Sequence, residues 1–222
     1  MDKYLSLLKR TQLFAGIGAE DIASMLQCLQ AKLRHYKKGE FIFRQGEHIR
    51  HIALLAEGCL HVQRDDYWGT RSIISVIEAG DMFAEGYAGP QCGPIPNDVV
   101  AVADSAVIFF DVGRVLTVCS AGCRFHSMVV KNLYFAISEK NRKLVQKLGH
   151  ITKRTTREKL ISYLSEEARR QNSGSFAIPF NRQQLADFLS VDRSAMSAEL
   201  CKMRDEGLLS FEKNRFTLFI RS

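Results

Sequence analysis

The chain has 222 residues, of which 46% are hydrophobic and 25% are charged, a balance that excludes a disordered chain and is typical of a globular protein. The formal net charge is +7, and residues 149–222 carry 13 Lys and Arg against 9 Asp and Glu. A basic C-terminal third suits a polyanionic partner. A chain of this length forms one large domain or two small ones, and needs neither a metal nor a disulfide to hold its core.

The start of the chain and its cysteines predict a cytoplasmic protein. No long apolar segment follows the first residues, MDKYLSLLKR, so we expect no signal peptide. The most apolar later run, residues 99–112, is interrupted by Asp104 and is too short to span a bilayer, so no membrane partner is expected. The six cysteines are scattered, which favours reduced thiols over a disulfide framework.

The first half of the chain changes from helical to strand-like patterning. Residues 1–34 carry apolar residues at helical spacing, interrupted by Gly16 and Gly18. Between His35 and Asp111, short β-prone runs such as FIF, IALLAEG, CLHVQ, SIISVI and VVAVA alternate with glycine-containing turns. Regular short strands of this kind predict a β-roll of about eight strands.

A stretch without proline, roughly residues 124–151, predicts one long helix of about 40 Å. Its apolar residues are expected to fall mostly on one stripe: Phe125, Met128, Val129, Leu133, Ala136, Ile137, Leu144, Leu148 and Ile151. The simplest way to bury such an apolar stripe is to pack it against the same helix of a second subunit, as in a coiled coil. Packing of the helix on its own β-roll is the alternative.

The stretch NRQQLADFLSVDRSAMSAELCKMRDEGLL, residues 181–209, predicts two helices joined by a tight turn. Asn181 with Gln184 has the form of a capping box, and Asp192 can cap the second helix. Met196, Leu200 and Met203 share the inner face of that helix. Its other side carries polar and small residues: Arg193, Ser194, Ser197, Ala198 and Cys201. This pattern is a helix-turn-helix, and the alternative is an αα-hairpin used only for packing.

The strand-like segments at residues 208–211 and 216–219 follow the second helix and supply a wing. The whole fold class is therefore α+β, with an N-terminal β-roll, a long dimerisation helix and a C-terminal winged helix-turn-helix. The segment RTTREKLISYL, before the two helices, places Leu160, Ile161 and Leu164 on one apolar face.

Three segments together resemble the CRP/FNR family of transcription regulators, the cyclic-AMP receptor-like regulators. KKGEFIFRQGEHIRHIALLAEGCLHV resembles the opening of the family's β-roll, RTTREKLISYL the helix after its dimer helix, and residues 181–209 its DNA-reading unit. The resemblance implies a cyclic-nucleotide-binding-like jelly roll in residues 1–118, a dimerisation helix in 119–151 and a DNA-binding domain in 152–222. It also implies a homodimer on palindromic double-stranded DNA, and RNA polymerase as a partner if the protein is an activator.

The resemblance assigns DNA contacts to named residues. Arg193, Ser194, Ser197 and Ala198 stand where the family reaches base edges, and Cys201 shares their face. Arg182, Lys202 and Lys213 are candidates for phosphate contact. Ala198 stands where the family often has an arginine, so the DNA half-site sequences that the family usually recognises cannot be assumed for this protein. Ser190 replaces the usual turn glycine, which predicts a bent backbone outside the left-handed region.

The resemblance places an effector in the β-roll. Glu85 matches the family's ribose-binding glutamate, but IPND, residues 95–98, has no cation where the cyclic phosphate would bind. A phosphate beside Asp98 without an arginine is unfavourable, which argues against cyclic AMP. The expected pocket is apolar to weakly polar and is formed by Phe83, Glu85, Tyr87, Asn97, Asp98 and Leu144.

The cofactor remains unknown from the sequence. Only Cys28 lies near the N-terminus, which argues against the family's iron–sulfur cluster. Cys119, Cys123 and His126 would share one helical face and could form a metal or redox site, although buried thiols beside Gly122 are the favoured interpretation. The sequence does not exclude haem as a cofactor, because a single protein ligand to the haem iron leaves no sequence motif.

We expect no enzymatic activity, because the sequence contains no glycine-rich phosphate loop, nucleophile elbow or paired His–carboxylate arrangement. The alternative to a DNA-binding regulator is a regulatory module that acts on a protein partner.

Overall fold

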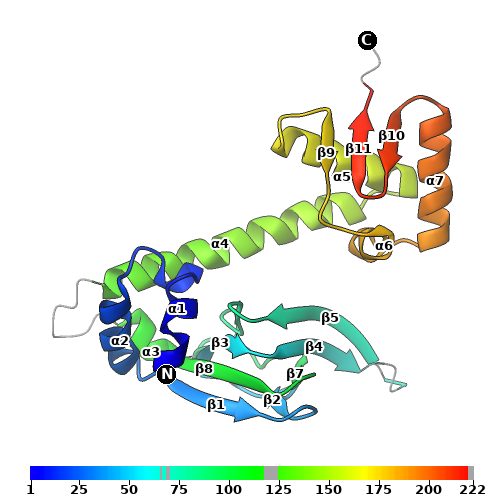
Figure 1. The fold of residues 1–222 in the computed structure, drawn as a ribbon. Helices are drawn as coiled ribbons and strands as arrows, with labels where there is room; N and C mark the ends of the chain where they lie inside the picture. Colours follow the sequence, from blue (N-terminus) through cyan, green and yellow to red (C-terminus); the bar gives the residue numbers. More distant parts are fainter. Residues whose placement is uncertain (66, 69–70, 118–124, 220–222) are drawn as a thin grey trace. The chain divides into compact units, whose positions relative to one another are not determined.

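The computed structural model describes residues 1–65, 67–68, 71–117 and 125–219, which form two compact units, Met1–Ser138 and Glu139–Ser222 (Figure 1). The first unit opens with short helices: η1 (Asp2–Tyr4), α1 (Leu5–Leu8), η2 (Gln12–Phe14) and α2 (Ala19–Cys28). Eight strands follow within the described residues: β1 (Lys32–Tyr36), β2 (Phe41–Phe43), β3 (His51–Glu57), β4 (Cys59–Asp65), β5 (Arg71–Glu78), β6 (Met82–Phe83), β7 (Asp98–Ala101) and β8 (Ser105–Asp111). The predicted β-roll is confirmed.

The strands pair antiparallel in two four-stranded sheets, with the orders β1-β8-β3-β6 and β2-β7-β4-β5. Because side chains alternate along a strand, β3 and β8 bury both of their faces. Ala53 and Leu55 enter the core between the sheets, whereas Ile52 and Leu54 enter a second core. This second core is formed with α1, α2, the short helix α3 (Val112–Leu116) and the start of the long helix α4 (His126–Ile151).

The turn between β3 and β4 depends on Gly58. Its φ of +97° lies in the region that favours glycine, and a Cβ atom there would lie 2.6 Å from the backbone oxygen of Asp104 and collide with Ser105. Glycine at this position allows the β3–β4 turn to pack against Asp104 and Ser105, where β8 begins.

Helix α4 confirms the long-helix prediction, but its apolar residues do not form one stripe. Val129, Leu133 and Ala136 are buried in the first unit, and Asn132 donates hydrogen bonds to the carbonyls of Leu13 and Ala15. A second stripe is exposed, and it includes Tyr134, Ile137, Leu144 and Leu148. The predicted single stripe was wrong because the start of the helix packs into the second core of the first unit, together with the N-terminal helices. None of the helices in the described ranges is long and apolar enough to span a membrane.

The second unit contains the end of α4, three further helices and a small sheet (Figure 1). The elements are α5 (Thr156–Arg170), β9 (Ser175–Ala177), α6 (Arg182–Leu189), α7 (Arg193–Asp205), β10 (Leu209–Glu212) and β11 (Arg215–Leu218), and the sheet order is β10-β11-β9. Leu160 and Leu164 of α5 are buried as predicted, together with Tyr163, but Ile161 is exposed. The prediction for Ile161 was wrong because the buried face of α5 is formed by Leu160, Tyr163, Leu164 and Glu167, and Ile161 points about 110° away from its centre.

Both predicted helix starts are confirmed. The Asn181 carboxamide and the Gln184 side chain exchange hydrogen bonds with each other's backbone N–H groups at 2.9 Å, and the Asp192 carboxylate accepts from the backbone N–H of Ala195 at 2.8 Å. These bonds satisfy N–H groups that have no partner within their helices.

The turn between α6 and α7 differs from the prediction. Ser190 has φ +52° and ψ +59°, so its backbone is left-handed, and the expectation of a bend outside that region was wrong. The ammonium of Lys159 donates to the carbonyls of Leu189 and Ser190, both at 3.2 Å. The lysine therefore binds the carbonyl end of α6 and stabilises a conformation that serine adopts at a cost.

Candidate DNA interface

The outer face of α7 has the properties of a DNA-reading surface. Met196 and Leu200 are fully buried and Met203 is 2% exposed, so they anchor the helix in the core of the second unit. The predicted base-contacting residues lie on the other side. Arg193, Ser194 and Ala198 are exposed, whereas Ser197 and Cys201 are half-buried. An exposed helix of small and polar residues on a rigid base can enter a major groove.

Two side chains in the first turns of α7 differ in whether their polar groups already have partners within the protein. The Ser197 hydroxyl donates to the Arg193 carbonyl at 2.9 Å, so its proton is engaged and its oxygen is left as an acceptor. No carboxylate in the described part of the chain pairs with the Arg193 guanidinium, which is exposed. An unpaired guanidinium can donate two parallel hydrogen bonds to a guanine.

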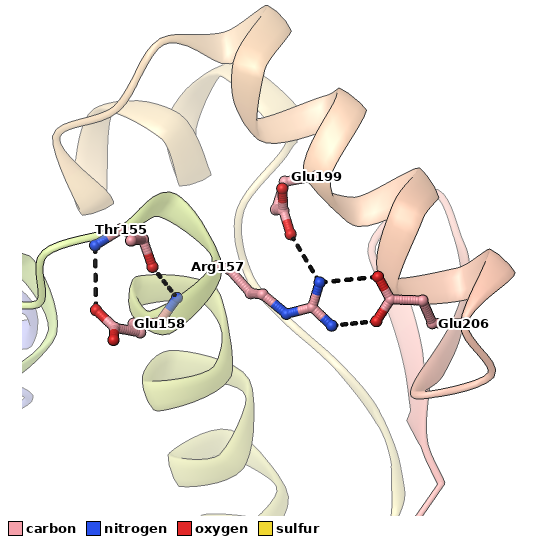
Figure 2. A network of polar contacts seen from close by, with 5 residues as sticks. All are labelled: Thr155, Arg157, Glu158, Glu199 and Glu206. Atoms are coloured by element: carbon pink, nitrogen blue, oxygen red, sulfur yellow. Dashed lines mark hydrogen bonds and ion pairs between the residues drawn. The ribbon is translucent and has the colours of Figure 1, made fainter.

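The position of α7 is held from α5 by Arg157 (Figure 2). Its guanidinium contacts the Glu199 carboxylate at 3.3 Å and forms a two-pronged ion pair with Glu206, one arm of which is 2.9 Å. The Glu206 carboxylate raises the pKa of Arg157 above its ordinary value. Glu199 lies on α7 and Glu206 is the residue that caps its C-terminal end, seven positions on, so the two carboxylates lie on the same side of the helix. The sequence analysis did not predict this role of Arg157, because no residue near it in the chain indicates that Glu199 and Glu206 are its partners.

Figure 2 also shows how α5 begins. Thr155 accepts from the Glu158 backbone N–H, and the Glu158 carboxylate accepts from that of Thr155, both at 3.1 Å. This capping box fixes the first turn of the helix that carries Arg157.

The predicted phosphate contacts lie around the start of α6, on α7 and on the wing. Arg182 is half-buried, with its guanidinium carbon 4.7 Å from the ring centre of Phe211 and 5.1 Å from that of Phe216, and burial lowers its pKa. Arg182 therefore also joins α6 to the wing. Lys213 is exposed at the wing turn, and Lys202 is exposed on α7. Seven residues line a concavity of about 480 Å³ beside the wing: Pro179, Phe180, Asn181, Arg182, Gln184, Lys213 and Asn214.

The predicted effector-binding residues of the first unit differ in their burial and in their contacts. Phe83 is buried between the sheets, with its ring 6.1 Å from that of Phe43. The Asp98 carboxylate accepts from the backbone N–H of Gln45 at 2.7 Å. Glu85 and Asn97 are half-buried, and Tyr87 is exposed. These five residues thus lie on or beside the connection from β6 to β7, whereas Leu144 is 61% exposed on α4, in the second unit.

The predicted cysteine site falls mostly outside the described residues, because these do not include Cys119 and Cys123. His126 is described and buried. Its Nε2–H donates to the Val115 carbonyl at 3.0 Å, and its Nδ1 lies 3.9 Å from the Cys28 thiol. Among the residues that the structure describes, no three His, Cys, Asp or Glu side chains are grouped as metal ligands.

Comparison with known proteins agrees with this geometry. Residues 33–121 match the model of the cyclic nucleotide-binding domain, and residues 158–221 match the model of the Crp-like helix-turn-helix domain. A search of curated protein sequences found no relative.

Solved structures share the fold at low sequence identity. The Thermus thermophilus catabolite activator protein is 21% identical, with 94% of each chain covered and a TM-score of 0.51. The c-di-GMP-responsive global regulator CLP of Xanthomonas campestris is 12% identical, with 92% of this chain and 100% of that chain covered and a TM-score of 0.55. The sensor domain of the regulator DNR from Pseudomonas aeruginosa is 21% identical, with 69% of this chain and 96% of that chain covered and a TM-score of 0.51.

A cyclic-nucleotide-binding-type roll followed by a long helix and a winged helix-turn-helix is the architecture of a DNA-binding transcription regulator. The two domain models together match most of the chain, one within its first unit and the other within its second. The chain therefore belongs to the CRP/FNR family of transcription regulators.

Proposed function

We propose that the protein is a homodimeric, sequence-specific DNA-binding transcription regulator of the cytoplasm, gated by a small-molecule or redox signal received in its first unit. The observation that carries the proposal is the outer face of α7. That face combines the unpaired guanidinium of Arg193 with small polar residues, and it stands on a helix held by Met196, Leu200 and Arg157.

The exposed stripe of α4 supports a dimer. Val130, Tyr134, Ile137, Asn141, Leu144, Leu148 and Ile151 alternate at spacings of four and three residues. This is the a and d pattern of a two-stranded coiled coil, and Leu144 and Leu148 are more than half exposed without a partner helix. Asn141 occupies an a position, where a polar residue fixes the register of two parallel helices. A second copy of the chain is the occupant that this pattern fits.

The signal is proposed to act on the β6–β7 connection. Glu85, Tyr87 and Asn97 offer polar groups there, beside the core residue Phe83. Residues 95–98 supply no cation for a cyclic phosphate, so we propose an effector other than cyclic AMP. A ligand gates the protein only if it binds one arrangement of the dimer more tightly than the other. If the protein is an activator, RNA polymerase is its further partner.

Selection of DNA from a pool of random duplexes tests the proposal. Purified full-length protein with reduced thiols should enrich a palindrome whose half-sites are centred about one helical turn apart. The variants R193A and S197A should then lose discrimination at specific positions of each half-site, whereas S173A, outside the interface, should recover the wild-type sequence.

The alternative function is a regulatory module for a protein partner. Binding through phosphates weakens steeply with salt, so weak DNA binding that enriches no sequence and does not change with salt would support the alternative. Enrichment without any palindrome would contradict the homodimer while leaving DNA recognition in place.

A further inference from the structure

The second unit contains a cavity that the proposed DNA contacts do not use. It has a volume of about 630 Å³ and lies between the last turns of α4, the second half of α5, the segment that enters α6 and Phe188 of α6. We call it the α4–α5 cavity. Its size falls within the usual range of small-molecule sites.

Four rings form one wall of the cavity. They belong to His150, Tyr163, Phe180 and Phe188. The centres of the Phe180 and Phe188 rings are 5.0 Å apart, and those of Tyr163 and Phe188 are 5.4 Å apart. Rings at these separations present a continuous apolar surface to a planar ligand.

His150 is fixed within this wall. It is 4% exposed, and its Nδ1 lies 2.9 Å from the Ser162 hydroxyl and its Nε2 3.2 Å from the Glu166 carboxylate. Its ring meets that of Tyr163 at 90°. Because both ring nitrogens are engaged, the imidazole is held in place and contributes a rigid surface.

The rest of the lining is charged and mostly positive. Five cationic side chains and two carboxylates line the cavity. Arg142 pairs with Glu139 at 2.6 Å, and Arg170 pairs with Glu167 at 2.7 Å. Within the described ranges no carboxylate pairs with Lys147, on α4, or with Arg169, on α5. The Lys147 ammonium lies 5.3 Å from the centre of the Phe188 ring, so an unpaired cation stands directly beside the aromatic wall.

The cavity lies on the opposite side of α4 from the proposed dimer stripe. The residues of α4 that line the cavity share one face, which is turned about 150° from that of Leu144 and Leu148 at 100° per residue: Arg142, Lys143, Gln146, Lys147 and His150. A partner helix on the dimer stripe would therefore leave the cavity open.

From these observations we infer that the α4–α5 cavity binds a planar aromatic anion. The aromatic ring of the ligand packs against Phe180 and Phe188, and its anionic group is neutralised by Lys147 and Arg169. Such a ligand would contact α4, α5, the end of α6 and the segment before α6 at once, which makes the cavity a second site for a regulatory molecule.

Naphthoate, a planar carboxylate, is the probe. Calorimetric titration of the full-length protein without DNA should give a Kd below about 1 mM, as expected of a ligand of this size. Two matched compounds separate the two parts of the site: naphthamide keeps the rings without the charge, and cyclohexanecarboxylate keeps the charge without the aromatic face. Each should bind at least about tenfold more weakly than naphthoate.

Three variants locate the binding. K147M removes the unpaired cation and F188L removes an aromatic surface, and each should weaken naphthoate binding at least about tenfold. K153M, an exposed position of the same unit outside the cavity lining, should leave it unchanged. Because Lys147 is only half-buried and pairs with no carboxylate within the described ranges, K147M should fold, and it decides the question even if F188L does not. Equal binding by wild type and K147M, equal binding of acid and amide, or no binding of naphthoate would overturn the proposal.

Discussion

Replacing Lys213 by glutamine tests how the wing contributes to DNA binding. Lys213 is exposed at the tip of the wing, beside the concavity that also includes Arg182. Its φ is +51°, and glutamine bears the same backbone cost as lysine there. The K213Q variant should therefore fold like the wild type while losing one cation next to the bound phosphates.

The expected change in the salt dependence of DNA binding follows from the number of cations proposed to contact phosphates. The proposed contacts of Arg182, Lys202 and Lys213 would amount to about six phosphate contacts in the proposed dimer, so log K against log salt should have a slope of about −5. Removing Lys213 from both protomers should reduce that slope to about −3.5. Between 50 and 200 mM salt, the affinity would fall by about three powers of ten for the wild type and by about two for K213Q.

Fluorescence anisotropy on the selected palindrome, at a series of NaCl concentrations, measures both slopes. K9Q, an exposed lysine of the first unit, is the matched control and should keep the wild-type slope. A slope for K213Q within about 0.5 of the wild-type value would refute the wing contact, and an equal change in K9Q would show that only net charge matters.

Three further predictions concern the dimer and the fold. L144D places a charge in the exposed stripe of α4, and in sedimentation experiments it should raise the dimer dissociation constant at least about 100-fold, whereas Q146D on the opposite face should not. G58A forces a Cβ against Ser105 and the Asp104 backbone at φ +97°, so urea unfolding should show a loss of about 2–4 kcal/mol; an unchanged midpoint would contradict that packing. S190G relieves the left-handed serine at φ +52° and should raise the unfolding free energy by about 0.5–1 kcal/mol, and a decrease would mean that the serine itself stabilises the turn.

Local features of the fold could be predicted because their causes lie within a few residues. The caps of α6 and α7 need only Asn181, Gln184 and Asp192, which act on backbone N–H groups three positions away. The buried face of α7 follows from helical spacing alone. The sequence therefore determined the helix-turn-helix, its outer face and the strand-rich first unit.

Other features depend on which residues meet in space, and only the tertiary structure decided them. The long helix divides into a buried stripe with Val129 and an exposed stripe with Leu144 because its start packs into the second core of the first unit. Spacing alone does not say which stripe meets which neighbour. Arg157 finds Glu206 49 positions away. The α4–α5 cavity likewise joins Lys147 with Phe188 across 41 positions. Contacts over such separations depend on how the helices pack, and no local pattern in the chain encodes them.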